Sequence, residues 1–584
     1  MKHKLLASFI LPIIALSLCN CSIFRATTEK TITVYNLDKL DNSLKDCKAG
    51  EVRARFNKDQ GYVPYLSLRQ YASLYDSHYQ DGAVNSVTRK GELVSWTVIK
   101  DGSIYFMTQI DFDKKEVVTA GSLDSVYKQD DDPRDTASLY YGNETAYESK
   151  LLGNSFYAHY SFANEEIDYF NYMGDYYLPL SFYDITYSFD TTIYFYYNYN
   201  AIYSTVSVDN FYQKKFVKGA SEYTVVSEMY SKKQSSTIPE YLLNLNSNLF
   251  LYLLDNFYGL REYKGFSSGE EYCKSIGTYE SLFVSDGAVR AQAYAETLDR
   301  LDDNHTALVA GSFIWDGSDI VSRQYGKSCM ERSALRGRLN RYRRDDTPTA
   351  YQDGDLALVS DDGTTAMILF DEFIYGSTEQ VFNDDGSIKD SAGKYDSFYY
   401  LLGYFRDLQE LGTVRNIILD MSTNGGGVLG VLMKLLALIS KNDEGSIYYL
   451  EAASQQLGIA TTRVDSDNNG IFNANDCYGD DFNIYLLTSD CSFSCGNAFP
   501  CLAQKEGMAK VIGQKSGGGE CAVAVHYLPN GEYVYHSSNL HLGYYDTNNE
   551  QFIGFENGAQ PDILVDDCND FFNINKLSTL IQNA

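Results

Sequence analysis

A serine near the C-terminal end of the chain has neighbours that suit attack on a carbonyl carbon. Residues 483–488 read NIYLLT, the apolar pattern of a buried strand, and SDCSFSCGNA (489–498) follows. A helix that begins at Ser494 would place its oxygen near positive backbone dipoles, and the N–H of Cys495 could donate to an oxyanion. A serine in this place is also a common helix N-cap, so both interpretations stay open.

A second segment of this kind lies earlier in the chain. Residues 414–420 (VRNIILD) predict another buried strand, MSTNGGG (421–427) follows, and an apolar helix is expected over 428–440. Glycine permits a close approach of backbones, and the N–H of Gly426 is a second candidate oxyanion donor. Glycine turns after strands are common, so this segment indicates a catalytic site only in combination with the segment that contains Ser494.

The surrounding elements predict an α/β layered core over residues 346–584. The expected strands cover 355–360, 365–370, 414–420 and 482–488, and helical patterns cover 395–408 and 428–440. A helical segment, 236–345, precedes this core and carries His305, with helices expected over 239–257 and 286–301.

The region before the helical segment, residues 51–235, is rich in tyrosine and predicts a β-rich domain. Its expected strands include 92–100, 103–110 and the aromatic stretch 182–211. Aromatic side chains suit half-buried strands, because the ring can pack on one side and stay in contact with water on the other. The whole chain is therefore expected to be a multidomain α+β protein.

The N-terminus predicts export. Lys2 and Lys4 precede an apolar stretch of signal-peptide length that ends in LCNCS (18–22). We expect a lipoprotein signal peptide over 1–21, lipidation at Cys21 and a tether over 22–50, although ordinary secretion is the alternative. The expected location is the bacterial cell surface or periplasm, with membrane contact only through the lipid anchor. A net charge of −30 disfavours nucleic-acid partners.

A separate motif predicts a structural calcium site. Residues 465–476 (DSDNNGIFNAND) fit the pattern D-x-[DN]-x-[DN]-G, in which oxygen ligands alternate along the loop. The candidate ligands are Asp465, Asp467, Asn469, Ile471, Asn473 and Asp476. The alternative is a turn rich in Asp and Asn with no ion. The nine cysteines after Cys21 could form disulfides after export, and their spacing does not predict a zinc site.

Four ordered elements between residues 350 and 570 resemble the tail-specific (C-terminal processing) serine peptidase family. The DMSTNGG segment resembles its D-x-R-x-N-x-G-G element, and SFSCGN (492–497) is similar to its T-A-S-A-S-E segment, with Ser494 at the reactive serine. VIGQKSGGG (511–519) and GAQPDI (558–563) resemble the two elements that follow. The resemblance implies a ClpP/crotonase-like core, a peptide or protein substrate and no catalytic cofactor.

The chain departs from the family pattern at two positions. Ser422 stands where the family has arginine, and Gly519 stands where it has the catalytic lysine. The tricorn-like branch uses serine, histidine and glutamate, which implies His305 as general base and Glu556 as the acid that orients it. Lys515 is the fallback base.

For His305 the alternative is a loop histidine that caps a helix, and for Glu556 it is a solvated surface acid. No PDZ domain is expected, because only about 45 residues separate His305 from the core. A catalytically inactive binding or carrier lipoprotein on the same fold is the second hypothesis. A glycan-binding surface lipoprotein, suggested only by the tyrosines, is the third.

Overall fold

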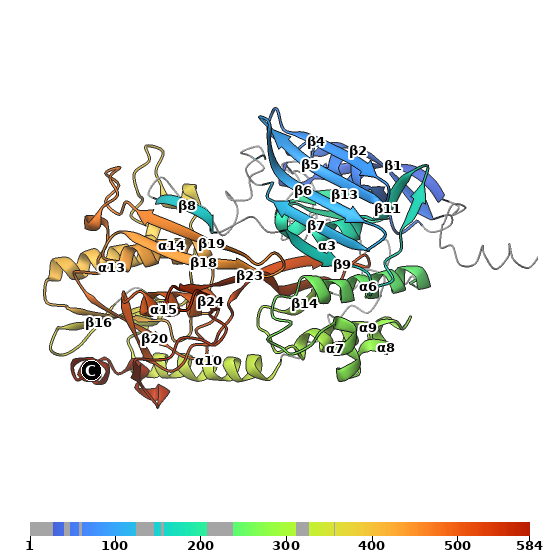
Figure 1. The fold of residues 1–584 in the computed structure, drawn as a ribbon. Helices are drawn as coiled ribbons and strands as arrows, with labels where there is room; N and C mark the ends of the chain where they lie inside the picture. Colours follow the sequence, from blue (N-terminus) through green and yellow to red (C-terminus); the bar gives the residue numbers. More distant parts are fainter. Residues whose placement is uncertain are drawn as a thin grey trace, which may run out of the picture.

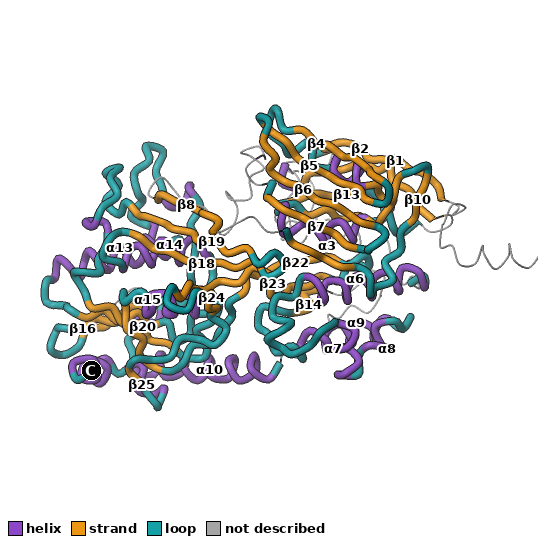
Figure 2. The backbone as a smooth tube through the Cα atoms, viewed as in Figure 1, coloured by secondary structure: helices purple, strands orange, loops and turns teal. Residues whose placement is uncertain are grey.

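The structure is a computed structural model with two parts joined by long strands and one helix (Figures 1 and 2). It describes residues 27–39, 47–57, 61–123, 126, 145–152, 157–206, 238–310, 326–354 and 357–584. The N-terminal sheets and the helices α6 to α9 form one part, and the core that carries Ser494 forms the other. The predicted signal peptide and Cys21 lie outside the described residues. Among the helices described, none has the length and apolar character needed to cross a membrane.

The N-terminal part contains two sheets. One has the order β10-β11-β3-β2-β1-β13-β12 and the other the order β4-β5-β6-β7-β9. The strands of the first sheet are β1 (Thr27–Asn36), β2 (Lys48–Asn57), β3 (Tyr65–Ser67), β10 (Phe170–Tyr172), β11 (Asp175–Pro179), β12 (Tyr194–Tyr197) and β13 (Ile202–Thr205). Those of the second are β4 (Val84–Lys90), β5 (Leu93–Lys100), β6 (Ser103–Asp111), β7 (Glu116–Gly121) and β9 (Ala158–Ser161), and a short helix, α2 (Leu68–Ser73), follows β3.

Two sequence-based expectations for this region were wrong. The expected tether over 22–50 includes β1, which pairs with β2 and β13 inside the first sheet. The stretch 182–211 was expected to be strand, but its first part belongs to helix α3 (Leu180–Thr191). The Phe182, Tyr183 and Tyr187 side chains are fully buried in the aromatic core, and this packing overrides the β preference of aromatic residues.

The helical segment shares the core of the N-terminal part. Its helices are α6 (Glu240–Asn256), α7 (Gly269–Ile276), α8 (Tyr279–Leu282) and α9 (Gly287–Asp299). Leucines along α6 are buried in the same apolar cluster as Trp96 and Phe182. The predicted domain boundary near residue 235 therefore does not separate two cores.

The core that carries Ser494 has a six-stranded sheet with the order β15-β16-β17-β20-β21-β25. Its strands are β15 (Leu358–Val359), β16 (Thr365–Leu369), β17 (Asn416–Asp420), β20 (Asn483–Thr488), β21 (Ala509–Gly513) and β25 (Ile563–Leu564). Its main helices are α13 (Ser397–Leu411), α14 (Leu429–Ile439), α15 (Cys495–Lys505) and α16 (Ile574–Gln582). All neighbouring pairs from β16 to β25 are parallel, so β17 and β20 end side by side and the loops after them meet.

A second sheet connects this core to the rest of the chain. It has the order β14-β23-β18-β19-β8, and β22 and β24 also pair with β23. The strands are β8 (Thr145–Leu152), β14 (Ala307–Ala310), β18 (Glu444–Glu451), β19 (Gln456–Val464), β22 (Cys521–Tyr527), β23 (Tyr533–Asp546) and β24 (Gln551–Gly554). β8 belongs to the predicted N-terminal domain, residues 51–235, but it pairs with β19 of the second sheet. The predicted domain boundaries are therefore wrong for this strand as well. β14 follows His305 directly and pairs with β23, so the second sheet holds His305 near the core.

The overall class is confirmed: the chain is a multidomain α+β protein with a β-rich N-terminal region and an α/β core.

Candidate active site

Ser494 has the backbone and the surroundings of a nucleophile. It precedes α15 with φ 57° and ψ −126°, a region that non-glycine residues rarely adopt, and its side chain makes no capping hydrogen bond. Such strain persists only where the surrounding structure enforces it, and it is concentrated at functional sites. Within the described residues the Ser494 oxygen has no hydrogen-bond partner, and the residue is only partly buried. The N-cap interpretation therefore does not account for this serine.

The glycine loop after β17 lies directly against Ser494. A Cβ placed on Gly426 would lie 2.7 Å from the Ser494 Cβ and 3.1 Å from the Cys495 nitrogen, so no side chain fits there. Gly426 also has φ 108°. The glycine is needed for this close approach of two backbones.

The two predicted oxyanion donors differ in their hydrogen bonding. The Gly426 N–H donates to Asn424 Oδ1 at 2.8 Å, so this donor is already used inside the loop. The Cys495 N–H begins α15 and donates to no acceptor among the described residues. Its position beside Ser494 at a helix N-terminus suits an oxyanion.

The Phe493 ring packs against Gly519, which stands at the position of the family lysine. A Cβ placed on Gly519 would lie 2.5 to 2.9 Å from three atoms of the Phe493 ring, and Gly519 has φ 89°. The ring therefore occupies the space that a side chain at position 519 would need. The guanidinium of Arg332 covers the same ring at 4.7 Å.

His305 also packs against the Phe493 ring. The two rings are 4.8 Å apart in an edge-to-face arrangement, and the backbone N–H of His305 donates to Asp303 Oδ1 at 3.0 Å. Its Nδ1 is buried and has no hydrogen-bond partner among the described residues. Burial lowers the pKa of His305, Asp303 opposes this effect and the charge of Arg332 adds to it. Neutral imidazole, the form that can accept a proton, is therefore favoured.

Glu556 reaches the same region but binds the backbone. Its Oε2 accepts the N–H groups of Gly519 and Glu520, each at 3.1 Å, and it is not hydrogen-bonded to His305. Burial raises the pKa of Glu556, and the nearby carboxylates of Asp303 and Glu520 raise it further. The structure brings Ser494, His305 and Glu556 around Phe493 and Gly519, but no hydrogen bond joins any two of the three among the described residues.

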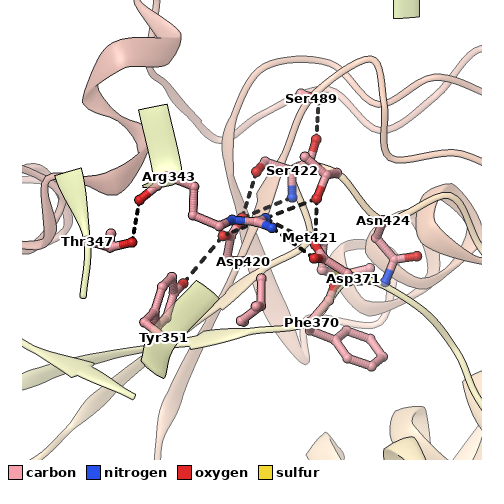
Figure 3. A network of polar contacts seen from close by, with 12 residues as sticks. Arg343, Thr347, Tyr351, Phe370, Asp371, Asp420, Met421, Ser422, Asn424 and Ser489 are labelled. Carbon is pink, nitrogen blue, oxygen red and sulfur yellow. Dashed lines mark hydrogen bonds and ion pairs between the residues drawn. The ribbon is translucent and has the colours of Figure 1, made fainter. Parts of the chain in front are cut away.

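Arg343 binds residues at the end of β17 and in the loop that follows it (Figure 3). It comes from α10 (Lys327–Asp346) and binds both Asp371 oxygens at 2.8 and 3.0 Å. Its Nη2 also donates to Asp420 Oδ2 at 3.1 Å and to the Thr423 oxygen. Ser422, which stands in the family arginine's position, donates its hydroxyl to the other Asp420 oxygen at 2.6 Å. The sequence analysis missed this arginine because it lies far from the loop in the chain.

One face of α10 carries two further arginines toward the site. Arg332 donates to Asp490 Oδ2 at 3.1 Å, and a Cβ placed on Gly425 would lie 3.1 Å from an Arg336 nitrogen. Positions 332, 336 and 343 are separated by one and two helical turns, so they share a face. This spacing predicts a shared helix face, but it does not predict which loop that face contacts.

A polar cavity of about 410 Å³ adjoins Glu556 and Arg332. Lys515, the fallback base, also lines it and is exposed, with its side chain near the Cα of Gly558. No hydrogen bond between Lys515 and Ser494 is found in the described part of the chain.

The predicted calcium loop brings three carboxylates together. One oxygen each of Asp465, Asp467 and Asp476 lies within 4.8 Å of the others. Within the loop, Asp465 accepts the N–H groups of Asn469 and Gly470. The other candidate oxygens are also engaged: Asn469 Oδ1 accepts the Ile471 N–H, and Asn473 Oδ1 accepts that of Asn475.

Comparison with known proteins places this core in a family. Residues 396–565 match the model of Peptidase family S41, which spans the α13 to β25 region that contains Ser494. No curated protein matches the chain.

Several solved structures are similar at low identity. A protein from Parabacteroides merdae described as a candidate peptidase is 16% identical, with 58% of this chain and 96% of that chain covered and a TM-score of 0.38. Mature CPAF bound to lactacystin is 11% identical, with 59% and 97% covered and a TM-score of 0.37. A lipoprotein from Streptococcus agalactiae is 12% identical, with 60% and 99% covered and a TM-score of 0.33.

The assignment to a peptidase class depends on the match to the family model and not on the similarity to these solved structures. Residues 396–565 are similar to Peptidase family S41, and this match supports serine peptidase as the enzyme class. The predicted resemblance to the tail-specific family and the predicted enzyme class are thereby confirmed.

Proposed function

We propose that the chain hydrolyses peptide bonds through an acyl-enzyme on Ser494. The observation that carries this proposal is the strained Ser494 backbone, with an unbonded side-chain oxygen beside the unused N–H of Cys495. Labelling with a fluorophosphonate, which modifies activated serines, tests it by comparison of the wild type with Ser494→Ala.

In the proposed reaction, His305 accepts the proton of Ser494 as its oxygen attacks the substrate carbonyl. The tetrahedral oxyanion accepts a hydrogen bond from Cys495. His305 then gives the proton to the leaving amine, and water hydrolyses the ester through the same base. Glu556 stabilises the imidazolium. The Phe493 ring must shift for His305 to reach Ser494, and peptide binding in the cavity beside Glu556 is the proposed cause.

The second candidate is a catalytically inactive binding or carrier protein on the same fold. The observation that favours it is that Ser494, His305 and Glu556 are not hydrogen-bonded to one another among the described residues. Absence of both labelling and cleavage in the wild type would support this candidate.

The pH dependence of peptide cleavage follows from the environment of His305. Burial lowers its pKa from the usual 6.5, and the neutral ring is the base. The specificity constant kcat/KM is therefore expected to be at its maximum at neutral pH and to decrease as the pH is lowered, with a midpoint below pH 6.5. Each sample is returned to neutral pH and assayed again, so that acid unfolding is recognised. A midpoint above 6.5, or an unchanged profile in His305→Ala, would contradict the assignment.

We also propose that the protein is exported and anchored by a lipid on Cys21. The support is the basic and apolar N-terminus that ends in LCNCS. Mass spectrometry of the protein from the membrane fraction of a bacterial host should show a lipid-modified N-terminal cysteine. Cys21→Ser should move the protein to the soluble fraction, and Cys47→Ser, a cysteine within the fold, should not. An unmodified N-terminus would support ordinary secretion.

A structural calcium ion in the loop 465–476 is a further part of the proposal. Its support is the convergence of three carboxylates, none of which pairs with a lysine or arginine in the described chain. Calcium is expected to raise the melting temperature, and chelation to lower it, because only the folded loop assembles the ligands. Asp467→Asn should weaken this effect, whereas Asp480→Asn, an exposed acid outside the loop, should not. Equal melting temperatures with calcium and with chelator would rule the site out.

A further inference from the structure

A second, larger cavity lies far from Ser494, in the part of the molecule that contains the helical segment. It has a volume of about 570 Å³ and lies between α6, α7, α8 and the segment 164–166 that follows β9. The helices α6 to α8 lie on the opposite side of the molecule from α13 (Figure 1). On α6, the lining residues follow one helical face: Asn244, Asn248, Leu251 and Asp255. Nothing in the proposed peptidase mechanism uses this cavity.

The deepest acid in this cavity has no charged partner of opposite sign. Glu165 is 5% exposed, and its Oε2 has no hydrogen-bond partner among the described residues. The carboxyl group of Glu165 also interacts with the Asp255 side chain through a hydrogen bond. No lysine or arginine of the described residues forms an ion pair with Glu165 or Asp255. Burial and the neighbouring Asp255 carboxylate raise the pKa of Glu165 to about 9. The raised pKa favours a proton shared by the Glu165 and Asp255 pair at neutral pH.

Two lining residues of the same cavity, Glu270 and Tyr279, already contact an ammonium group of the chain itself. The Lys274 ammonium pairs with Glu270 and lies 4.7 Å from the centre of the Tyr279 ring. Tyr279 packs against Phe283, and both rings line the cavity. A carboxylate next to an aromatic face is a favourable environment for an organic cation. Glu270 is thus paired with a basic side chain, whereas Glu165 and Asp255 form no ion pair with a basic side chain of the described residues.

The spread of the oxygen atoms favours an organic cation over a metal ion. Groups of three potential metal ligands within 4.8 Å occur at two other places in the described chain, and Glu165 and Asp255 belong to neither. A cavity of this volume accommodates an alkyl ammonium or a guanidinium with its carbon chain, which Leu251 and the two aromatic rings can contact.

We propose that this cavity binds an organic ammonium or guanidinium group, with Glu165 and Asp255 as its charged partners and Tyr279 and Phe283 as its aromatic wall. The group can come from a basic side chain of a peptide or from a free polyamine. The site is independent of Ser494, so it stands whether or not the chain is an active peptidase.

The charged groups around Glu165 determine how binding depends on pH. Asp255 of α6, Glu270 of α7 and the adjacent Glu166 are acidic, and Arg261 acts on Asp255 from the loop after α6. A cation binds the ionised form of Glu165, so binding at neutral pH must release the proton that the free site holds. The affinity should rise about tenfold per pH unit from about pH 7 to about pH 9, and then level off.

Isothermal titration calorimetry of the full-length protein tests the proposal. The first probe is cadaverine, a free diamine. The second is lysine amide acetylated on its α-amino group, which presents the side-chain ammonium as a peptide would. Titration in two buffers of different ionisation enthalpy should show release of about one proton per site at neutral pH. Glu165→Gln should weaken binding about tenfold or more and abolish proton release, because the charged partner is lost. The matched control is Glu262→Gln, an exposed acid outside the cavity.

Binding of either probe with these properties supports the proposal, and the tighter probe identifies the source of the cation. The proposal is overturned if neither probe binds, if Glu165→Gln and Glu262→Gln behave alike, or if only calcium binds and is lost in Glu165→Gln. If Glu165→Gln does not fold, the pH dependence of wild-type binding decides instead. A flat dependence between about pH 7 and about pH 9 then overturns the proposal.

Discussion

Ser494→Ala is expected to lower kcat for peptide cleavage by about 10⁵ to 10⁶-fold, the loss seen when the nucleophile of a serine peptidase is removed. The reason is that the acyl-enzyme cannot form, while any contribution of Cys495 to the oxyanion remains. Fluorophosphonate labelling should disappear together with cleavage. Ser387→Ala, which changes a serine in an exposed turn, is the matched control and should retain both.

The strained backbone at Ser494 gives this prediction a second readout. Ser494→Gly should also be inactive, but it should raise the free energy of unfolding by about 1 to 3 kcal/mol relative to Ser494→Ala, because glycine adopts φ 57° without strain. If Ser494→Ala had the activity of the wild type, a residue other than Ser494 would be the nucleophile. An inactive but less stable Ser494→Gly would show that the backbone is not strained.

Arg343→Met is expected to lower the free energy of unfolding by about 3 to 5 kcal/mol, because it leaves buried charge without a partner. Asp420 is 0% exposed, and its Oδ2 loses the guanidinium when Arg343 is replaced. The loop 421–427 depends on this contact, so peptide cleavage should fall as well. Urea denaturation and cleavage rates measure the two effects.

The control for Arg343→Met is on the same helix. Arg344 is 61% exposed in its side chain and pairs only with the equally exposed Asp345, so Arg344→Met should change the stability little. The double variant Arg343→Met/Asp420→Asn should recover part of the loss, because the orphaned carboxylate is neutralised. Equal stability of Arg343→Met and Arg344→Met would show that the network does not support the loop.

The strands and helices of the core that carries Ser494 could be predicted from local sequence patterns. The strands β16, β17 and β20 and the helices α13 and α14 lie within a few residues of their predicted bounds. The buried strands are short continuous apolar runs and the helices are longer apolar segments, and both patterns are visible in the local sequence. The same segments place Gly426 and Ser494 after adjacent parallel strands, which is why Ser494 could be predicted as the candidate nucleophile. Helix α3 was missed because burial among other aromatic rings, rather than the local preference of its residues, decides its conformation.

The candidate serine, the glycine loop and the peptidase class could be predicted from the linear pattern of residues. The surroundings of Ser494 depend on contacts between segments that are far apart in the chain. Phe493 fills the space at Gly519, Arg343 binds the end of β17 and the loop that follows it, and His305 is brought to the site by β14. These contacts join residues distant in the chain, and they depend on volume and on charge burial, neither of which leaves a periodic signal in the sequence.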